Sequence, residues 1–267
     1  MSADPHYLIE ALDLDGTALC IHSSMRSFNP RIEASTIIQA LVDAGCTILV
    51  PTFTYFNEVI PPADDHPSVN GMEYSKPDAR LKSGRQVYHP AGNELSFHDM
   101  GNFPATLLAM KERTRGDHPL NSFSAIGELA DELTSGQTWE DVYAPLRKLV
   151  ELDGKLLLMG TDLTSMTFIH YAEQVAGRNL FIRWARDSKS KVKRARIGSC
   201  SRAFNKLQLS LDHLRKDIHF RQSRCQLLPA RQALDVLVSA IVSNPGITHC
   251  KDRMCLRCSS AVKGGPQ

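Results

Sequence analysis

The stretch ALCIHSSMRSFNPRIEASTIIQALVDAGCTILVPTFT, residues 18–54, contains the pattern that decides the fold. An apolar run over 18–22 ends at a pair of serines, the segment 33–44 carries apolar residues at helical spacing, and a second apolar run covers 46–50. A strand, a helix and a strand within about 30 residues are typical of a βαβ unit, which favours parallel pairing. We therefore expect an α/β protein with functional loops at the carboxyl ends of these strands.

A second unit of this kind lies further along the chain. Residues 155–159, KLLLM, are apolar throughout, as in a strand of a sheet that is covered on both faces. Thr164 or Ser165 then offers an N-cap for a helix over 166–175. The repetition of strand, loop and helix supports the same α/β class.

Between these units the segment 57–99 is rich in Pro, Gly, Asp, Ser and His and has little periodicity. Because compact domains rarely carry so long a loop without a use, we expect an excursion on the substrate side of the molecule. The alternative is a disordered insert, against which the interspersed aromatic residues argue.

The overall composition sets outer limits. The chain has 267 residues and a formal net charge of +2, which allows one large domain or two smaller ones and does not suit a protein that wraps a polyanion. No window approaches the roughly 18 apolar residues of a membrane-spanning helix. Acidic Asp4 with Pro5 and His6 stand where a signal peptide would be basic and then apolar, so we expect a cytoplasmic protein.

His170 and Glu173 lie three residues apart on the helix expected after Gly160, and therefore on one face. A carboxylate that orients an imidazole makes it a better general base near neutral pH. The alternative is a buried histidine bonded to a backbone carbonyl, with Glu173 in solvent.

Two polar loops follow the first two strands, His22 to Ser27 and Pro51 to Thr54. Their hydroxyl and N–H groups suit a phosphate, a pantetheine amide or an oxyanion. The glycines of a P-loop or a dinucleotide fingerprint are absent, and a helix-capping loop is the alternative.

The seven cysteines are unevenly spread. Cys255 and Cys258 form a C-x2-C pair, and such a pair can place two thiolates on one tetrahedral zinc ion. We expect Cys200 and His249 to complete the site, with Cys225 or Cys250 in reserve. Free reduced thiols are the alternative.

A run of seven basic residues between 183 and 196 could meet phosphate groups or nucleic acid. Such a run is usually a solvated hairpin, and only Trp184 is near enough to stack on a base.

Taken together, six segments in order resemble the aminoglycoside 3-N-acetyltransferase family, antibiotic N-acetyltransferases that use acetyl-CoA and do not have the GNAT fold. The similarity runs from about residue 17 to the end. The segments are IHSSMRS (21–27), VPTFT (50–54), DMGNFP (99–104), HP with SFSAIG (118–119 and 122–127), LDGKLLLMG (152–160) and SMTFIHYAE (165–173).

The resemblance implies a three-layer α/β/α sandwich around a largely parallel or mixed sheet, with residues 1–267 as a single domain. The C-terminal portion, 197–267, is expected to be stabilised by zinc. The implied reaction moves acetyl from acetyl-CoA directly to an amine, with His170 as general base and Glu173 as its orienting partner. Residues implied to line the CoA tunnel or its junction with the amine site are His22, Ser23, Ser24, Met25, Arg26, Ser27, Pro51, Thr52, Phe53, Thr54, His118 and Ser122.

The implied acceptor is an aminoglycoside, acetylated at the 3-N position, which makes the protein an antibiotic-resistance enzyme. Aminoglycosides are polycations, and the excursion offers countercharge from Glu58, Asp64, Asp65, Glu73, Asp78, Glu94 and Asp99. The excursion is longer than in many drug-modifying members, so another amine metabolite stays open as acceptor. The remaining alternative is a non-enzymatic zinc module that binds nucleic acid.

Overall fold

The computed structural model describes residues 4–76, 81 and 87–266, and its centre is a seven-stranded mixed sheet. The strand order is β3-β4-β2-β1-β5-β9-β8. The bounds are β1 Ala18–Ser23, β2 Thr47–Pro51, β3 Thr114–Arg115, β4 Phe123–Ile126, β5 Lys155–Met159, β8 Lys216–Phe220 and β9 Ser223–Pro229. The expected α/β class is confirmed.

Parallel pairing is restricted to the three central strands of this sheet. β1 pairs in parallel with β2 on one side and β5 on the other, in a register that sets Cys20 opposite Leu49 and Leu156. The outer strands are all antiparallel to their neighbours. Because β1, β2 and β5 run the same way, their carboxyl ends meet at one edge of the sheet.

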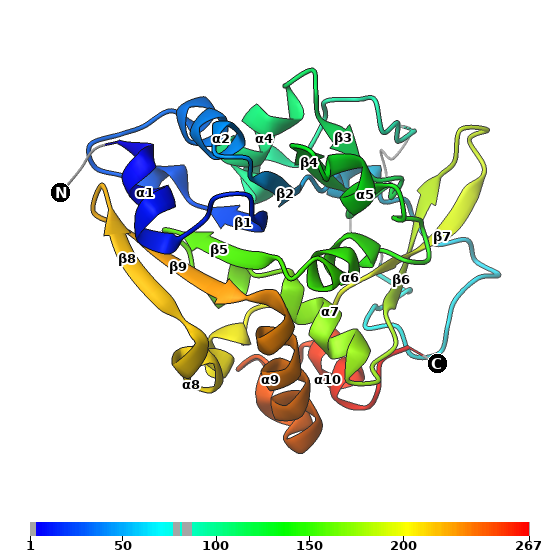
Figure 1. Ribbon diagram of the computed structural model, residues 1–267. Coiled ribbons are helices and arrows are strands. Elements are labelled where there is room, and N and C mark those ends of the chain that lie inside the picture. The colour runs from blue at the N-terminus through cyan, green and yellow to red at the C-terminus, as the bar shows by residue number, and fades with distance from the viewer. Residues whose placement is uncertain (1–3, 77–80, 82–86, 267) are drawn as a thin grey trace.

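Helices cover both faces, so the three-layer sandwich expected from the resemblance is confirmed (Figure 1). One face packs against α1 Pro5–Leu12, α2 Ala34–Asp43 and α4 Asn102–Leu108. The other packs against α5 Ala130–Thr134, α6 Ala144–Glu151, α7 Phe168–Val175, α8 Gln208–Leu211 and α9 Ala230–Ser243. Each layer buries its own apolar cluster against the sheet, and burial of this kind is the main stabilising contribution.

The excursion packs against a separate two-stranded hairpin, β6 Phe181–Arg186 and β7 Val192–Ile197, at the right of Figure 1. Val59 joins Ile182 and Trp184 in a small apolar cluster, and Asn70 exchanges hydrogen bonds with the backbone of Ile182. The Trp184 indole donates to Asp65 at 2.7 Å. The described part of the excursion is therefore ordered against the hairpin, which contradicts the disordered alternative.

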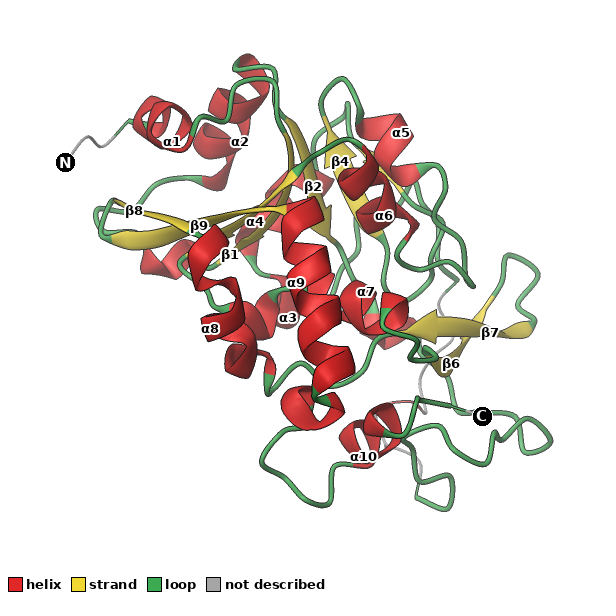
Figure 2. Cartoon of the chain, turned by 60° about the horizontal axis from the view of Figure 1, so that its bottom comes forward, coloured by secondary structure: helices red, strands yellow, loops and turns green. Residues whose placement is uncertain are grey.

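The C-terminus lies beside the excursion and the hairpin (Figure 1). α10 Leu256–Val262 begins directly after Cys255 and contains Cys258, and it lies below α7 and the hairpin in Figure 2. α3 Phe97–Met100 closes the excursion. None of the described helices combines the length and apolarity that crossing a membrane requires.

Candidate functional site

A cavity of about 750 Å³ lies at the carboxyl ends of β1 and β2. Its wall includes His22 and Ser23 of β1 and Pro51 of β2, together with Phe53 just beyond. Other parts of the wall come from the excursion, from α7 and from the segment after β7. This is the edge where open α/β sheets bind ligands, as the sequence predicts.

His170 lines this cavity, and Glu173, three residues later on α7, contacts the imidazole without lining the cavity itself. His170 Nδ1 lies 3.0 Å from Glu173 Oε2, and the two side chains are 13% and 4% exposed. Because a carboxylate accepts, the imidazole donates through Nδ1, which leaves Nε2 without a proton in the neutral ring. The alternative, with Glu173 in solvent, is wrong.

Glu173 is held from its other side by two residues that the sequence analysis did not identify. Arg178 Nη1 donates to Oε1 at 2.5 Å, and Ser199 Oγ donates to Oε2 at 2.5 Å. Burial acts to raise the pKa of Glu173, but hydrogen bonds from His170 and Ser199 and the charge of Arg178 outweigh it and lower that pKa. Glu173 is therefore a stable carboxylate. Nothing in the local sequence pattern links Ser199 to α7.

The His170 ring is fixed by packing as well as by its hydrogen bond. Phe204 contacts it edge-on with ring centroids 4.7 Å apart, and Tyr143 stacks at 6.5 Å. Gly198 passes so close that an added Cβ would lie 2.6 Å from Cγ of His170. Only glycine permits this approach, and the imidazole keeps one orientation.

Three buried polar atoms of the cavity wall have no hydrogen-bond partner among the described residues. They are Ser23 Oγ, Asn121 Oδ1 and Tyr143 Oη. Buried polar atoms are nearly always paired in folded proteins, so three orphans around one cavity indicate a ligand with polar groups.

Several residues expected to contact CoA lie outside the cavity wall and serve the structure. Thr52 Oγ1 donates to the Ser122 carbonyl, Thr54 Oγ1 donates to the Pro119 carbonyl, and Ser122 Oγ donates to the Thr52 carbonyl. His118 is fully buried and its Nδ1 accepts from two backbone N–H groups. Burial lowers the pKa of His118 to about 3, so it stays neutral. The polar atoms of these four side chains bond internally and none of the four lines this cavity, so their contact with CoA stays a prediction.

The serine loop reaches the cavity only through its first two residues, His22 and Ser23. Ser24 precedes a short 3₁₀ turn, Met25–Ser27, in which Arg26 is exposed. Ser27 Oγ donates to the Ser24 carbonyl and pairs with Ser223 Oγ at 2.6 Å. Ser24, Met25, Arg26 and Ser27 thus do not line this cavity, since the turn folds back on β9, and their contact with CoA stays a prediction.

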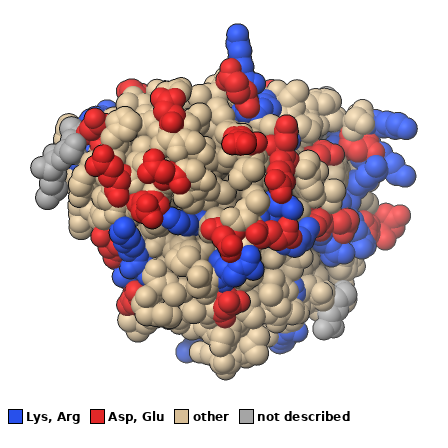
Figure 3. All heavy atoms as spheres, in the orientation of Figure 1, with Lys and Arg blue, Asp and Glu red and all other residues tan. Residues whose placement is uncertain are grey.

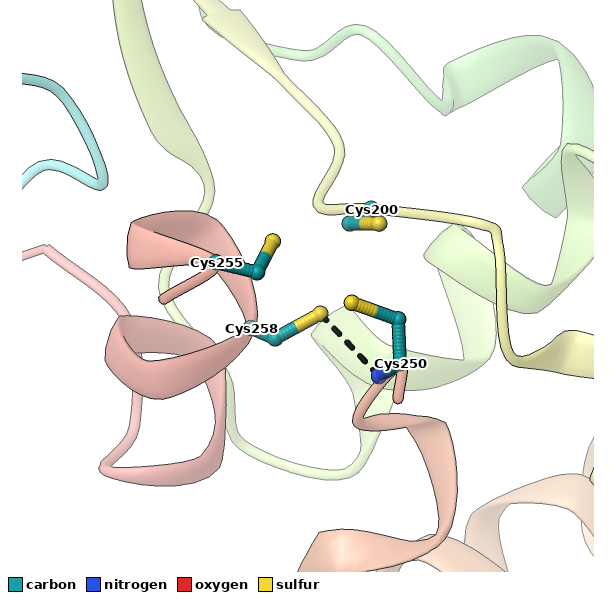
Figure 4. A group of neighbouring side chains, drawn as sticks. All are labelled: Cys200, Cys250, Cys255 and Cys258. Carbon is teal, nitrogen blue, oxygen red and sulfur yellow. Dashed lines mark hydrogen bonds between the residues drawn. The ribbon is translucent and has the colours of Figure 1, made fainter. Parts of the chain in front are cut away.

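Four cysteine thiols converge beside the cavity (Figure 4). Cys200, Cys250, Cys255 and Cys258 are all buried, and their Sγ atoms lie within 4.8 Å of one another. A tetrahedral Zn²⁺ with Zn–S bonds of about 2.3 Å requires sulfurs roughly 3.8 Å apart, so this cluster fits zinc. The Cys250 N–H donates to Cys258 Sγ, a contact suited to a thiolate.

The fourth member of this cysteine cluster is Cys250, which the sequence analysis held in reserve, in place of His249. His249 Nδ1 donates to the carbonyl of Cys250 at 2.6 Å, and its ring does not join the group. The prediction of His249 as a ligand is therefore wrong. Cys225, the other reserve candidate, is buried in β9, where burial raises the pKa of its thiol to about 12.

Positive charge lies next to the cluster. Arg202 Nη2 is 3.8 Å from Cys255 Sγ, and a hydrogen bond with Cys200 together with the charges of the other thiols raises the pKa of Arg202. Burial acts to raise the pKa of Cys255, but hydrogen bonds from the neighbouring cysteines lower it. A metal ion bound here would require all four thiols to lose their protons, and the positive charge of Arg202 favours the thiolate form.

The chain belongs to the aminoglycoside 3-N-acetyltransferase family, whose model matches residues 20–241. It is 34% identical over 101 residues to aminoglycoside N(3)-acetyltransferase VII of Streptomyces paromomycinus, which covers 36% of this chain and 35% of that protein. It is 32% identical over 171 residues to aminoglycoside N(3)-acetyltransferase IX of Micromonospora chalcea, which covers 61% and 57%. The matches thus span about a third to somewhat over half of these relatives' lengths.

Solved structures agree with the fold over a greater length. Aminoglycoside acetyltransferase AAC(3)-IVa superposes with a TM-score of 0.74 at 22% identity, over 99% of this chain and 98% of that one. The YokD protein of Bacillus subtilis superposes with a TM-score of 0.74 at 21% identity, over 91% and 100%. At these identities the likeness concerns the fold alone.

Proposed function

We propose that this protein is an N-acetyltransferase that moves acetyl from acetyl-CoA directly to an amine of an aminoglycoside, at the 3-N position. The observation that carries the proposal is the buried His170–Glu173 pair at the wall of the cavity. Membership of the family and the names of the relatives support the same reaction.

His170 serves as the general base. An alkyl ammonium must lose a proton before its nitrogen can attack a thioester carbonyl, and the free Nε2 of His170 accepts that proton. Glu173 stabilises the imidazolium that results, and Arg178 with Ser199 keeps Glu173 charged and in place. As the carbon–sulfur bond breaks, the imidazolium returns the proton to the leaving CoA thiolate.

The unpartnered polar atoms of the wall suit the acyl group and the amine. Ser23 Oγ can donate to the carbonyl oxygen as negative charge develops on it, and Asn121 Oδ1 can accept from the attacking nitrogen. His22 contributes shape rather than charge, because burial lowers its pKa to about 4.

Direct transfer agrees with the state of Cys20, the cysteine of β1. Cys20 lies in β1, 3.8 Å from His22 Nε2, and burial raises the pKa of its thiol to about 12. A thiol that stays protonated near neutral pH is a poor nucleophile, so an acyl-enzyme at Cys20 is disfavoured.

Two carboxylates of the excursion, Glu58 and Asp99, line the cavity and provide countercharge for a cationic acceptor. Asp78 lies outside the described residues. A variant of the fold relative AAC(3)-IVa has been solved in complex with a gentamicin, which supports an aminoglycoside as acceptor here. The second candidate is an amine metabolite of different charge, favoured by the arginine described in the next subsection.

The nucleic-acid alternative loses support because its basic run is paired. Four of the seven residues meet carboxylates: Arg183 with Glu58, Lys193 with Asp187, Arg194 with Asp65, and Arg196 with Glu140. On the face drawn in Figure 3, blue and red side chains are interspersed around the hairpin. Phosphate binding requires unpaired positive charge.

The cysteine cluster is proposed to hold one structural zinc ion through Cys200, Cys250, Cys255 and Cys258. Closed four-sulfur ligation leaves no position for a substrate, so the ion would join the chain ends and take no part in the chemistry. We further propose that residues 1–267 unfold as one domain, with 197–267 as the zinc-stabilised portion, in the cytoplasm, where thiols stay reduced.

The test is release of free CoA thiol from acetyl-CoA with a panel of amines. Gentamicin or a related aminoglycoside is expected to be turned over, and product analysis by NMR is expected to place the acetyl group on the 3-amino nitrogen. A folded protein that neither releases thiol with any amine nor gains thermal stability from millimolar acetyl-CoA would overturn the proposal.

A further inference from the structure

The loop of the C-x2-C pair contributes an arginine to the catalytic cavity. Arg257 stands between Cys255 and Cys258, whose thiols both belong to the cluster, and its side chain lines the same cavity as His170. The cluster therefore lies next to the site, and fixing the two cysteines fixes the backbone of Arg257.

The excursion packs directly on this arginine. A Cβ added at Gly71 would lie 2.8 Å from Cα of Arg257 and 2.6 Å from the ring of Phe181 in β6. Gly71 also has a φ of 57°, a left-handed conformation that favours glycine. Arg257 is thus held between the excursion and the hairpin, in the wall that also carries Glu58 and Asp99, the carboxylates proposed to face the acceptor.

One of the two carboxylates in the cavity wall is already paired with another arginine. Glu58 already faces the buried Arg183, with Oε1 3.3 Å from Nε. Burial, followed by the positive charge of Arg257, lowers the pKa of Arg183 to about 10, so the two guanidinium groups are close neighbours. No hydrogen bond or ion pair joins Arg257 to any residue within the described ranges. The charged side chains of the wall are thus Arg257, Glu58, which Arg183 already pairs, and Asp99, a poor match for a purely polycationic ligand.

We propose that Arg257 forms an anion-binding subsite at the acceptor end of the cavity, and that the preferred acceptor carries a carboxylate or phosphate in addition to its amine. The inference rests on the proposed acetyl transfer and, of the two acceptors proposed above, selects the amine metabolite of different charge over an aminoglycoside. A guanidinium binds either group through paired N–H donors, while Asp99 remains available to an ammonium group of the same molecule. Arg257 is in these terms a specificity residue, and His170 performs the chemistry on any amine that binds.

The experiment compares amino sugars that differ in an anionic group: glucosamine, glucosamine 6-phosphate and muramic acid. Binding is measured by calorimetry in the presence of CoA, so that the result does not depend on turnover, and thiol release is measured alongside. The variants are Arg257→Gln and Arg257→Glu, with Arg253→Glu as the matched control. Arg253 is an exposed arginine four residues earlier that does not line the cavity, and its change alters the net charge equally.

Wild type and Arg253→Glu are expected to bind at least one anionic sugar about 10- to 100-fold more tightly than glucosamine, the usual worth of a charge-assisted pair. Arg257→Glu is expected to lose or reverse that preference, while the affinity for CoA stays the same. The phosphate and carboxylate arms identify which anion is read.

The subsite is overturned if wild type shows no preference for an anionic sugar, if Arg257→Glu keeps the preference, or if its main effect is on CoA. Failure of the proposed function gives a different result: a binding preference that depends on Arg257 with no thiol release from any amine.

Discussion

The His170–Glu173 pair and the cysteine cluster lie next to each other but are assembled differently. The pair needs only one turn of α7, because residues three apart on a helix meet by local geometry. The cluster takes Cys200 from the segment after β7, Cys250 from the end of the chain beyond α9, and the pair Cys255 and Cys258 from the start of α10. The first arrangement can be read from spacing, whereas the second depends on the whole fold.

The two regions are also connected. Ser199, which donates to Glu173, is followed at once by Cys200 of the cluster, and Arg257 of the cavity lies between two cysteines. A substitution in the cysteine cluster could therefore change the activity of the His170–Glu173 pair, and a substitution near the pair could change metal binding by the cluster. The predictions below measure both effects.

The largest expected effect belongs to the pair. His170→Ala should lower kcat by roughly 10²–10⁴, the usual worth of a general base, with little change in the affinity for acetyl-CoA. Steady-state kinetics and calorimetry measure both. His219→Ala, at an exposed histidine of β8, is the matched control and should act like wild type. Near wild-type turnover by His170→Ala at pH 7 would remove His170 from its role.

The next effect belongs to the cluster. Cys258→Ser should lower the free energy of unfolding by about 3 kcal/mol or more, because loss of a metal is among the few single changes that exceed the ordinary range. Melting in the presence of a chelator, together with metal analysis, measures this. Wild type should hold about one zinc per chain and lose stability with chelator.

A control variant and the number of unfolding transitions test the zinc prediction further. Cys225→Ser, outside the cluster, should remain sensitive to the chelator, whereas Cys258→Ser should not respond to it. Wild type should unfold in a single transition. Metal-free wild-type protein with an unchanged Tm would refute the zinc site, and two separate transitions would refute the single domain.

Glu173→Gln should lower kcat by about 10- to 100-fold, less than loss of the base itself, because the amide still orients the ring but cannot stabilise an imidazolium. Glu173→Gln should also change how the free energy of unfolding depends on pH. The native pKa of Glu173 lies below its ordinary value, so its contribution is present above about pH 4.3 and is lost as pH falls through the lower native pKa. The difference in stability between wild type and Glu173→Gln should therefore shrink on acidification, as urea unfolding between pH 6 and pH 3 would measure. A difference that stays constant contradicts the assignment.

The smallest expected effect belongs to Ser199, which connects Glu173 to the cysteine cluster through the adjacent Cys200. Ser199→Ala should lower kcat by about 3- to 10-fold, less than the full worth of a hydrogen bond to a charged group because Ser199 acts on the rate only through Glu173, and it should leave the zinc content unchanged. Ser199→Thr keeps the hydroxyl and should recover part of the rate. If Ser199→Ala loses metal in proportion to activity, the hydroxyl serves the cluster, and its role toward Glu173 is wrong.

The same contrast explains what the sequence could predict. The unit over 18–50, the strand 155–159 and the α7 pair depend on neighbours within a few residues, and the structure confirms these elements. The antiparallel outer strands β8 and β9 join the sheet through pairings far along the chain, which local spacing does not encode. Ser199 and Arg178 were missed for that reason, since neither carries a pattern that points to Glu173.

Errors in the site have an equally physical origin. The loop hydroxyls of Thr52 and Thr54 have the right chemistry for a ligand, but backbone carbonyls of the segment 119–122 bind them first. His249 and Cys250 are adjacent, and the choice between them depends on which side chain the backbone turns toward the other thiols. Residue type predicts what a side chain can do, whereas only the fold decides whether it has a free partner.

Three consecutive residues after β7 each serve a different neighbour: Gly198 admits the His170 ring, Ser199 holds Glu173, and Cys200 joins the thiols. Insertion or deletion of a single residue there would shift all three at once. The described residues of the excursion, by contrast, contribute no strand to the central sheet. Insertions and deletions should thus accumulate during evolution in the excursion, where they alter the range of acceptors. They should be rare at 198–200, because a change in length there would move three side chains away from their partners at once.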